Sequence, residues 1–320
     1  MPASLAKLVT DATRIRIPIE RLECSPSSED GIDAATEEKL RHYGATLIQK
    51  AGVLLRMPQL FIASAAVFFH RLYFEKSFAE VEVKAAAGAA LFLAGKVEER
   101  VRKLSDVVLA LYRVEVREDS PEFAGGPAPK IDKESKDYSK LKRRVSDAEN
   151  LILQVHAYNC DGVTEHAHKY FLEYCRQIGK SPAMSALAQH AWGHLNDTLI
   201  SPICCIYHPS DLAAMGLLLA SRDLKMKLPS RPPWWEVFDA DRKQVLLLAS
   251  ELIKMHRRAG PPTYVQISKG SKAPGASAPV SSPGPMASPS DDEAPPANAD
   301  SDTAAEEEDG APPAKARRLE

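Results

Sequence analysis

The sequence is poor in the features that mark secreted and membrane-spanning proteins. Its five cysteines are an odd number with no Cys-x-x-Cys pair, which favours reduced, mostly buried thiols in an intracellular protein over a disulfide framework. No apolar run is long enough to span a bilayer, and the N-terminal stretch MPASLAKLVTDATRIRI contains no apolar core of signal-peptide length. We therefore expect a soluble protein that is neither secreted nor bound to a membrane.

An excess of charge of one sign is also absent. The 41 basic and 43 acidic residues give a formal net charge of −2. Acidic residues outnumber basic ones from Pro261 to the end, so the part before Pro261 is near neutral with a small basic excess. A near-neutral domain does not indicate bulk attraction to nucleic acid or anionic lipid. We expect no direct binding to nucleic acid.

The most informative stretch that is present runs from Val83 to Arg100 and reads VKAAAGAALFLAGKVEER. It has the length of a helix and carries almost no polar side chains before Lys96, and a helix that is apolar all round is typical of the middle of a bundle. Its side chains are mostly small, and Gly88 costs up to ~1 kcal/mol of helix propensity relative to alanine. Close packing against neighbouring helices explains both features, and the polar residues from Lys96 onward predict that the helix reaches the surface there.

Apolar residues at helical spacing predict four further helices around this one. They run over residues 36–55, 58–76, 103–115 and 138–158. Thr36 is the expected N-cap of the first. We interpret residues 1–32 as an extended arm and 117–137, which is rich in glycine, proline and charge, as a surface loop within a first domain of residues 33–160.

The pattern then recurs. Predicted helices follow over residues 164–178, 182–200, 210–224, 232–239 and 241–258, and a shift of 126 residues places LFLAGK over LLLASR, with Lys96 on Arg222. The chain therefore predicts an all-α fold of two five-helix bundles related by internal duplication, the second over residues 161–258. Pro, Ala, Ser and acidic residues dominate after that, so we expect a disordered tail over 259–320.

No motif for catalysis, nucleotide binding or metal binding stands out. Gly88 and Gly95-Lys96 are spaced wrongly for a phosphate-binding loop, and Val97 stands where serine or threonine should follow the lysine. His190 and His194 have the spacing of a metal pair, but Ala191 replaces the glutamate of the metalloprotease motif. We expect no catalytic residue, metal or cofactor.

Several ordered stretches resemble a known family. LFLAGKVEE, followed by DAENLILQV, resembles the first cyclin box, in which the central helix ends in Ala-x-Lys-x-Glu-Glu and the fifth helix carries a glutamate. The match sharpens toward the cyclin L group through DGIDAATEEKLRHYGATLIQKAGVLLRMPQ, FFHRLYFEKSF, HLNDTL and LPSRPPWWEVF, in the same order. The resemblance covers about residues 15–258.

The resemblance implies a tandem cyclin fold that binds and activates a cyclin-dependent kinase and has no cofactor. It also implies a nuclear protein linked to pre-mRNA splicing and RNA polymerase II transcription. Taken alone, Lys96 and Glu149 are typical of solvated surface charges, but they match the pair with which cyclins anchor the kinase. Val97 and Leu153 match apolar neighbours in that interface, and Glu98 and Glu99 complete the motif.

Two departures limit what the resemblance implies. The first predicted helix reads KLRHYGATLIQ and lacks the patch with which cell-cycle cyclins dock substrates, which favours the transcription class. The C-terminal segment lacks the Arg/Ser repeats of many cyclin L proteins, so the splicing link is weaker than the kinase link. Three alternatives stay open: a nucleic-acid-binding adaptor like general transcription factor IIB, a helical scaffold without a kinase, and an enzyme.

Overall fold

The computed structural model describes residues 16–22, 24–119, 133–160, 163, 165–178, 182–228, 230–258, 260, 262, 264–265 and 267. Every regular element in these ranges is a helix, and the only β pairing is one isolated bridge between Ser230 and Pro233. The predicted all-α class is confirmed.

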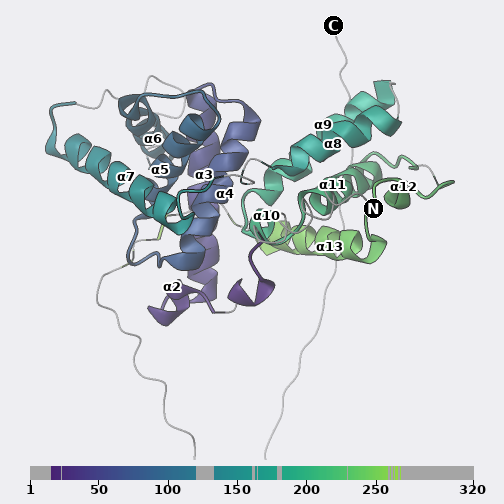
Figure 1. Ribbon diagram of the computed structural model, residues 1–320, viewed down its shortest axis with the longest axis horizontal. Helices are drawn as coiled ribbons and strands as arrows, with labels where there is room; N and C mark the ends of the chain where they lie inside the picture. The colour runs from purple at the N-terminus through teal and green to yellow at the C-terminus, as the bar shows by residue number, and fades with distance from the viewer. Residues whose placement is uncertain are drawn as a thin grey trace, which may run out of the picture. The chain divides into compact units, whose positions relative to one another are not determined.

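The first bundle is built around α5 (Val83–Val97), the helix that the sequence placed at its centre. It contacts each of the other four helices of the bundle, as Figure 1 shows. These are α3 (Ala34–Leu54), α4 (Gln59–Glu75), α6 (Leu104–Asp119) and α7 (Lys136–Val155). A Cβ added at Gly88 would lie 2.6 Å from Cδ1 of Leu111 and 3.0 Å from Cγ2 of Val145. The small residues of α5 therefore allow α6 and α7 to approach closely.

The second bundle has the same plan and its own apolar core. It comprises α8 (Ala167–Ile178), α9 (Pro182–Thr198), α11 (Pro209–Asp223), α12 (Trp234–Val237) and α13 (Arg242–Arg258). Its central helix is α11, which contacts α8, α9 and α13. Both ends of α11 lie 126 residues after the corresponding ends of α5, as the predicted duplication requires.

The two central helices also end in the same turn. After α5, Glu99 has φ 58°, its N–H donates to the carbonyl of Lys96, and the N–H of Arg100 donates to the carbonyl of Gly95. After α11, Lys225 has φ 52° and the equivalent two bonds run to Arg222 and Ser221. This pair of bonds around a left-handed residue is the Schellman motif, which satisfies the last carbonyls of a helix.

The structure differs from the sequence-based expectations in several places. The segment expected to be an extended arm contains a short 3₁₀ helix, η1 (Ile19–Leu22), and a single helical turn, α2 (Pro26–Glu29). A further short helix, α10 (Ile203–Ile206), lies between α9 and α11. The N-cap of α3 is Asp33 and not Thr36, because the Asp33 carboxylate accepts the N–H of Thr36.

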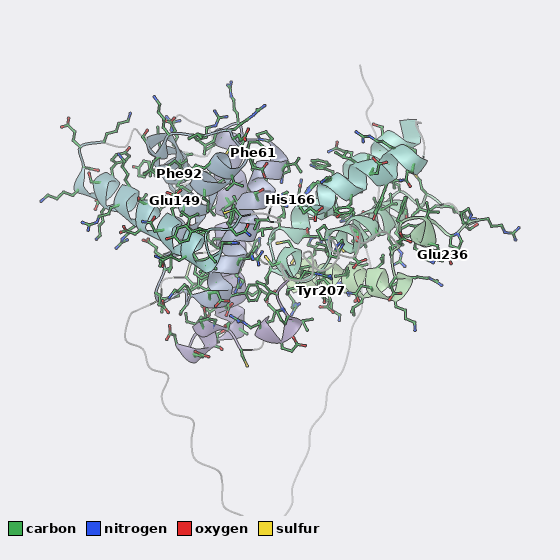
Figure 2. All side chains as sticks on the ribbon, in the orientation of Figure 1. Phe61, Phe92, Glu149, His166, Tyr207 and Glu236 are labelled. Carbon is green, nitrogen blue, oxygen red and sulfur yellow. The ribbon has the colours of Figure 1, made fainter. Side chains whose placement is uncertain are left out.

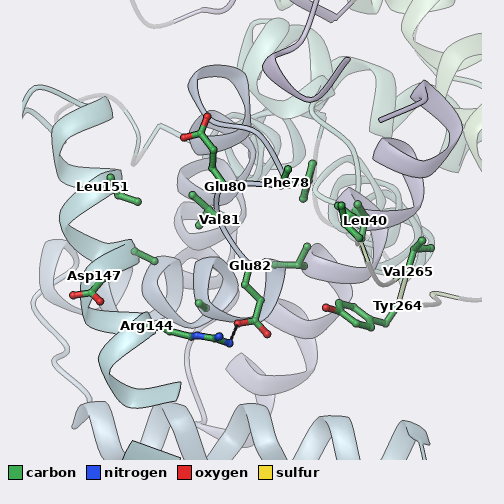
Figure 3. A pocket seen from close by; sticks show the side chains of 15 residues that line it. Leu40, Phe78, Glu80, Val81, Glu82, Arg144, Asp147, Leu151, Tyr264 and Val265 are labelled. Carbon is green, nitrogen blue, oxygen red and sulfur yellow. Dashed lines mark hydrogen bonds and ion pairs between the residues drawn. The ribbon is translucent and has the colours of Figure 1, made fainter. Parts of the chain in front are cut away.

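The predicted loop over 117–137 is shorter at both ends, because α6 continues to Asp119 and α7 begins at Lys136; residues 120–132 lie outside the described residues. Most of the predicted tail also lies outside them. Those of its residues that are described include Val265 and Ile267, which pack against the first core, and the more exposed Tyr264. They line a cavity of about 290 Å³ beside Leu40 and Val81 (Figure 3).

Candidate functional site

The structure brings together the two charged residues that the resemblance singled out. Lys96 lies in the last turn of α5 and Glu149 in α7, and Nζ of Lys96 donates to Oε1 of Glu149 at 2.7 Å. The Glu149 side chain is only 8% exposed, whereas that of Lys96 is 44% exposed. The pair therefore combines an ordered carboxylate below the surface with an ammonium group that water and a partner can reach.

Local sequence explains why these two side chains meet. In α7, Val145, Ala148 and Ile152 face the core of the first bundle, and Glu149 lies beside Ala148 at its margin. In α5, Lys96 is the first charged residue after the buried apolar stretch. Because α5 and α7 pack together, the margin of one helix lies opposite the end of the other.

An aromatic ring completes the surroundings of the ammonium group. Nζ of Lys96 lies 4.2 Å from the centroid of the Phe92 ring, one helical turn earlier in α5. A cation this close to a ring face is stabilised by about 0.5–1 kcal/mol at a solvent-exposed site. Figure 2 labels both Phe92 and Glu149, and together they fix the direction in which Lys96 points.

The apolar members of the predicted site lie beside this pair. Val97 and Leu153 are both half-buried and pack against the edge of the first core. Each keeps part of its side chain on the surface. They can therefore add apolar contact next to the charged pair, and apolar surface is enriched at the centre of protein–protein interfaces.

The two glutamates that complete the motif face different ways. Glu98 is the C-cap residue of α5 and accepts a hydrogen bond from the Ser64 hydroxyl of α4 at 2.6 Å. Glu99 is exposed and adopts the left-handed conformation described above. Glu98 is thus bonded within the molecule, and Glu99 points to solvent.

Sequence reasoning missed three residues around this site. Phe92 could have been found, because it precedes Lys96 by four residues and so shares its helix face. Ser64 and His166 could not, because they are 102 residues apart and meet only in the folded chain, with the Ser64 hydroxyl 2.8 Å from Nε2 of His166. Burial lowers the pKa of His166 to about 3.

Other chemistry finds little support in the described part of the chain. His194, considered above as half of a metal pair, contacts Oδ2 of Asp223 at 2.7 Å. Among the residues that the structure describes, no group of His, Cys, Asp and Glu is arranged to hold a metal ion. No described helix combines the length and the apolar character needed to cross a bilayer.

Comparison with known proteins gives this fold and site a family. Residues 19–159 match the family model described as the cyclin N-terminal domain, and the chain belongs to the cyclin family. It is similar to cyclin L in particular, as the ordered sequence motifs predicted.

Several curated relatives carry that name. The chain is 36% identical to Cyclin-L1-1 of Arabidopsis thaliana over 226 residues, which cover 71% of this chain and 52% of the relative. It is 32% identical to Cyclin-L1 of Homo sapiens over 245 residues, which cover 77% of this chain and 45% of the relative. The chain thus spans about half the length of the curated relatives it matches.

A solved structure supports the fold independently. A chain in the crystal structure of the yeast RNA Pol II CTD kinase CTDK-1 complex superimposes with a TM-score of 0.61 and 17% sequence identity, covering 76% of this chain and 73% of that chain. At this level of identity the similarity is one of fold.

Proposed function

We propose that the chain is the regulatory subunit of a cyclin-dependent protein kinase and that it binds and activates that kinase through one face of the first bundle. We call this face the anchor face; it comprises Lys96, Val97, Glu98, Glu99, Glu149 and Leu153. The observation that carries the proposal is the 2.7 Å ion pair between Lys96 and Glu149, in a chain whose sequence belongs to the cyclins.

The geometry of the anchor face suits recognition of another protein's backbone. Lys96 has three N–H donors, and its bond to Glu149 uses one of them. The exposed side of the ammonium group can donate to carbonyl groups of a partner. Glu149 holds the ammonium in place and can accept from a partner N–H with its second oxygen, while Val97 and Leu153 supply apolar contact. Ordered side chains that lose their water on binding, at the centre of an interface, typically dominate its binding energy.

Activation follows from how protein kinases work. A kinase is active only when its catalytic Lys–Glu ion pair is formed, and this depends on the position of one helix of the kinase. A partner that binds the inward position of that helix more tightly shifts the equilibrium by its differential affinity. The anchor face lies at the end of α5 and on α7, and four helices surround α5. This packing gives it the rigidity to favour one position.

We further propose that the protein acts in the nucleus, in transcription and pre-mRNA splicing. Support comes from the cyclin L relatives and from the RNA Pol II CTD kinase complex whose fold is similar. The helix α3 lacks the substrate-docking motif of cell-cycle cyclins, which agrees with a role in transcription.

Substitution of the ion pair tests the proposed function. We expect Lys96→Ala and Glu149→Ala each to weaken binding of the kinase by roughly 2–4 kcal/mol. The kinase subunit would be recovered with the full chain from nuclear extract, identified by mass spectrometry and purified for calorimetric titration. Circular dichroism would check that each variant is folded.

Lys84→Ala is the matched control. Lys84 lies in the same central helix as Lys96, but it pairs with Glu115 of α6, away from the anchor face. It should leave kinase affinity unchanged. A folded Lys96→Ala, Glu149→Ala double variant that binds as tightly as the natural chain would refute the assignment.

A further inference from the structure

Three side chains from distant parts of the sequence form a connected polar chain next to the anchor face. Ser64 of α4 is fully buried, His166 just before α8 is 5% exposed, and Glu98 is the C-cap of α5. The Ser64 hydroxyl lies 2.6 Å from Oε1 of Glu98 and 2.8 Å from Nε2 of His166. Figure 2 labels His166, the member that comes from the second bundle.

The number of available protons fixes which group donates and which accepts along this series of hydrogen bonds. A hydroxyl has one proton, and a carboxylate can only accept. Ser64 therefore donates to Glu98, in preference to the carbonyl of Leu60 at 3.2 Å, and its oxygen accepts the Nε2–H of His166. All three groups are satisfied only in the order His166 to Ser64 to Glu98.

We propose that Ser64 and His166 are positioning residues through which the second bundle sets the conformation of the kinase-binding turn at Glu98 and Glu99. This inference rests on the proposed function and names a device that regulates the same site. The turn needs such support because Glu99 holds a left-handed conformation that is sterically unfavourable for a non-glycine residue. The hydrogen bond from the buried Ser64 hydroxyl holds Glu98 in place, and Glu98 is the residue directly before Glu99.

A second contact between the bundles provides a matched control. Nε2 of His70, which is fully buried in α4, lies 2.9 Å from the carbonyl oxygen of Leu199 near the end of α9. This bond also joins the first bundle to the second, but it does not reach the turn. A role in joining the bundles is therefore separable from a role in positioning the turn.

The experiment compares His166→Leu, His166→Gln, Ser64→Ala and His70→Leu in the full chain. Hydrogen exchange would be measured at the amides of Glu99 and Arg100, which bond to Lys96 and Gly95. Calorimetric titration would measure the affinity of each variant for the kinase subunit that is recovered from nuclear extract with the natural chain. His166→Gln is the conservative variant, because its side-chain amide can donate in place of Nε2–H.

We expect His166→Leu and Ser64→Ala each to speed exchange in the turn by at least about fivefold and to weaken kinase binding by about five- to twentyfold. His166→Gln should keep both quantities at their natural values. In a His166→Leu, Ser64→Ala double variant the two losses should not add, because each substitution breaks the same series of hydrogen bonds. His70→Leu should lower thermal stability but leave turn exchange and kinase affinity unchanged.

Three outcomes overturn the inference: unchanged exchange in His166→Leu, an equal effect of His70→Leu, or faster exchange with kinase affinity within twofold of the natural chain. Failure of the proposed function itself is distinguishable. If the proposed function fails, Lys96→Ala leaves kinase binding unchanged. The exchange measurement still tests the positioning of the turn, because it is made without the kinase.

Discussion

Glu99 and Lys225 hold the same left-handed position in two copies of one helix ending, 126 residues apart. Glycine is the residue that adopts this conformation without steric cost, and neither copy has it. Lys225 follows the central helix of the second bundle, where no kinase contact is proposed, whereas Glu99 belongs to the anchor face. The two positions therefore separate the conformational role of the turn from its role in binding.

The first prediction substitutes glycine at each of these positions. Glu99→Gly and Lys225→Gly should each raise the free energy of unfolding by about 0.5–1 kcal/mol, because relief of left-handed strain exceeds the added entropy of the unfolded chain. Urea denaturation measures this change. Glu99→Gly should also weaken kinase binding, whereas Lys225→Gly should not. Equal kinase affinity in the two variants would remove Glu99 from the anchor face.

The second prediction concerns the close packing of α5. Gly88→Ala should lower the free energy of unfolding by about 1–3 kcal/mol, because the new methyl group collides with Leu111 and Val145. This cost exceeds the gain of up to ~1 kcal/mol in helix propensity.

Gly193 of α9 is the matched control for that substitution. An added Cβ there has nothing within 4 Å, so Gly193→Ala should stabilise by about 0.5–1 kcal/mol. If Gly88→Ala were as stable as the natural chain in thermal and urea unfolding, the small residues of α5 would not be explained by packing.

The third prediction is a loss of stability at mildly acidic pH. Burial lowers the pKa of His70 and His166 to about 3 and that of His156 to about 4, whereas unfolded histidines titrate near 6.5. Between these values the unfolded state binds more protons. The free energy of unfolding should therefore fall as the pH drops from about 6.5 toward 4, by up to about 1.4 kcal/mol per pH unit for each histidine.

His70→Gln isolates one of these contributions, because its amide can still donate to the carbonyl of Leu199. The variant should show a pH slope smaller by about 1.4 kcal/mol per pH unit between pH 4.5 and 6. Burial raises the pKa of Asp197 and Asp211, so these carboxyl groups favour the folded state as the pH falls, opposite to the histidines. This effect is the same in the natural chain and in the variant and cancels when their slopes are compared. Identical slopes would show that His70 does not stay neutral in the folded protein.

The fourth prediction concerns the segment that follows the second bundle. The Tyr264 ring lies 5.3 Å from that of Tyr43 and 4.7 Å from Nζ of Lys84, so this segment covers part of the first core. Tyr264→Ala should lower the free energy of unfolding by about 1–2 kcal/mol through lost apolar and cation–π contact. Thermal unfolding measures the loss.

Lys140→Ala, at an exposed position of α7, serves as the control and should change the free energy of unfolding by less than about 0.5 kcal/mol. If Tyr264→Ala unfolds at the natural temperature, the contacts of this ring do not contribute to stability.

Much of the fold could be predicted because its determinants are local. The small, apolar residues of α5 specify a buried helix wherever they occur, and the 126-residue shift repeats them. Short features without periodicity could not be predicted: α10 has only four residues, and Asp33 and Thr36 are both ordinary capping residues, so only the chain path decides between them.

The candidate site divides in the same way. Lys96 and Glu149 lie 53 residues apart, and nothing in their local patterns joins them; only the resemblance to cyclins paired them before the fold was seen. The link from His166 through Ser64 to Glu98 has no local pattern at all, because it depends on how the second bundle meets α4.

The bond between His70 and Leu199 bears on attempts to build hybrid cyclins. The imidazole of His70 is completely buried in one half of the molecule, and its Nε2–H donates to a carbonyl group of the other half. Grafting a foreign second half onto this first half would orphan that group unless the donor chain offered a carbonyl in the same place, at a penalty of about 1–3 kcal/mol. Although the central helices of the two halves repeat one pattern, this bond makes the halves complementary and not exchangeable.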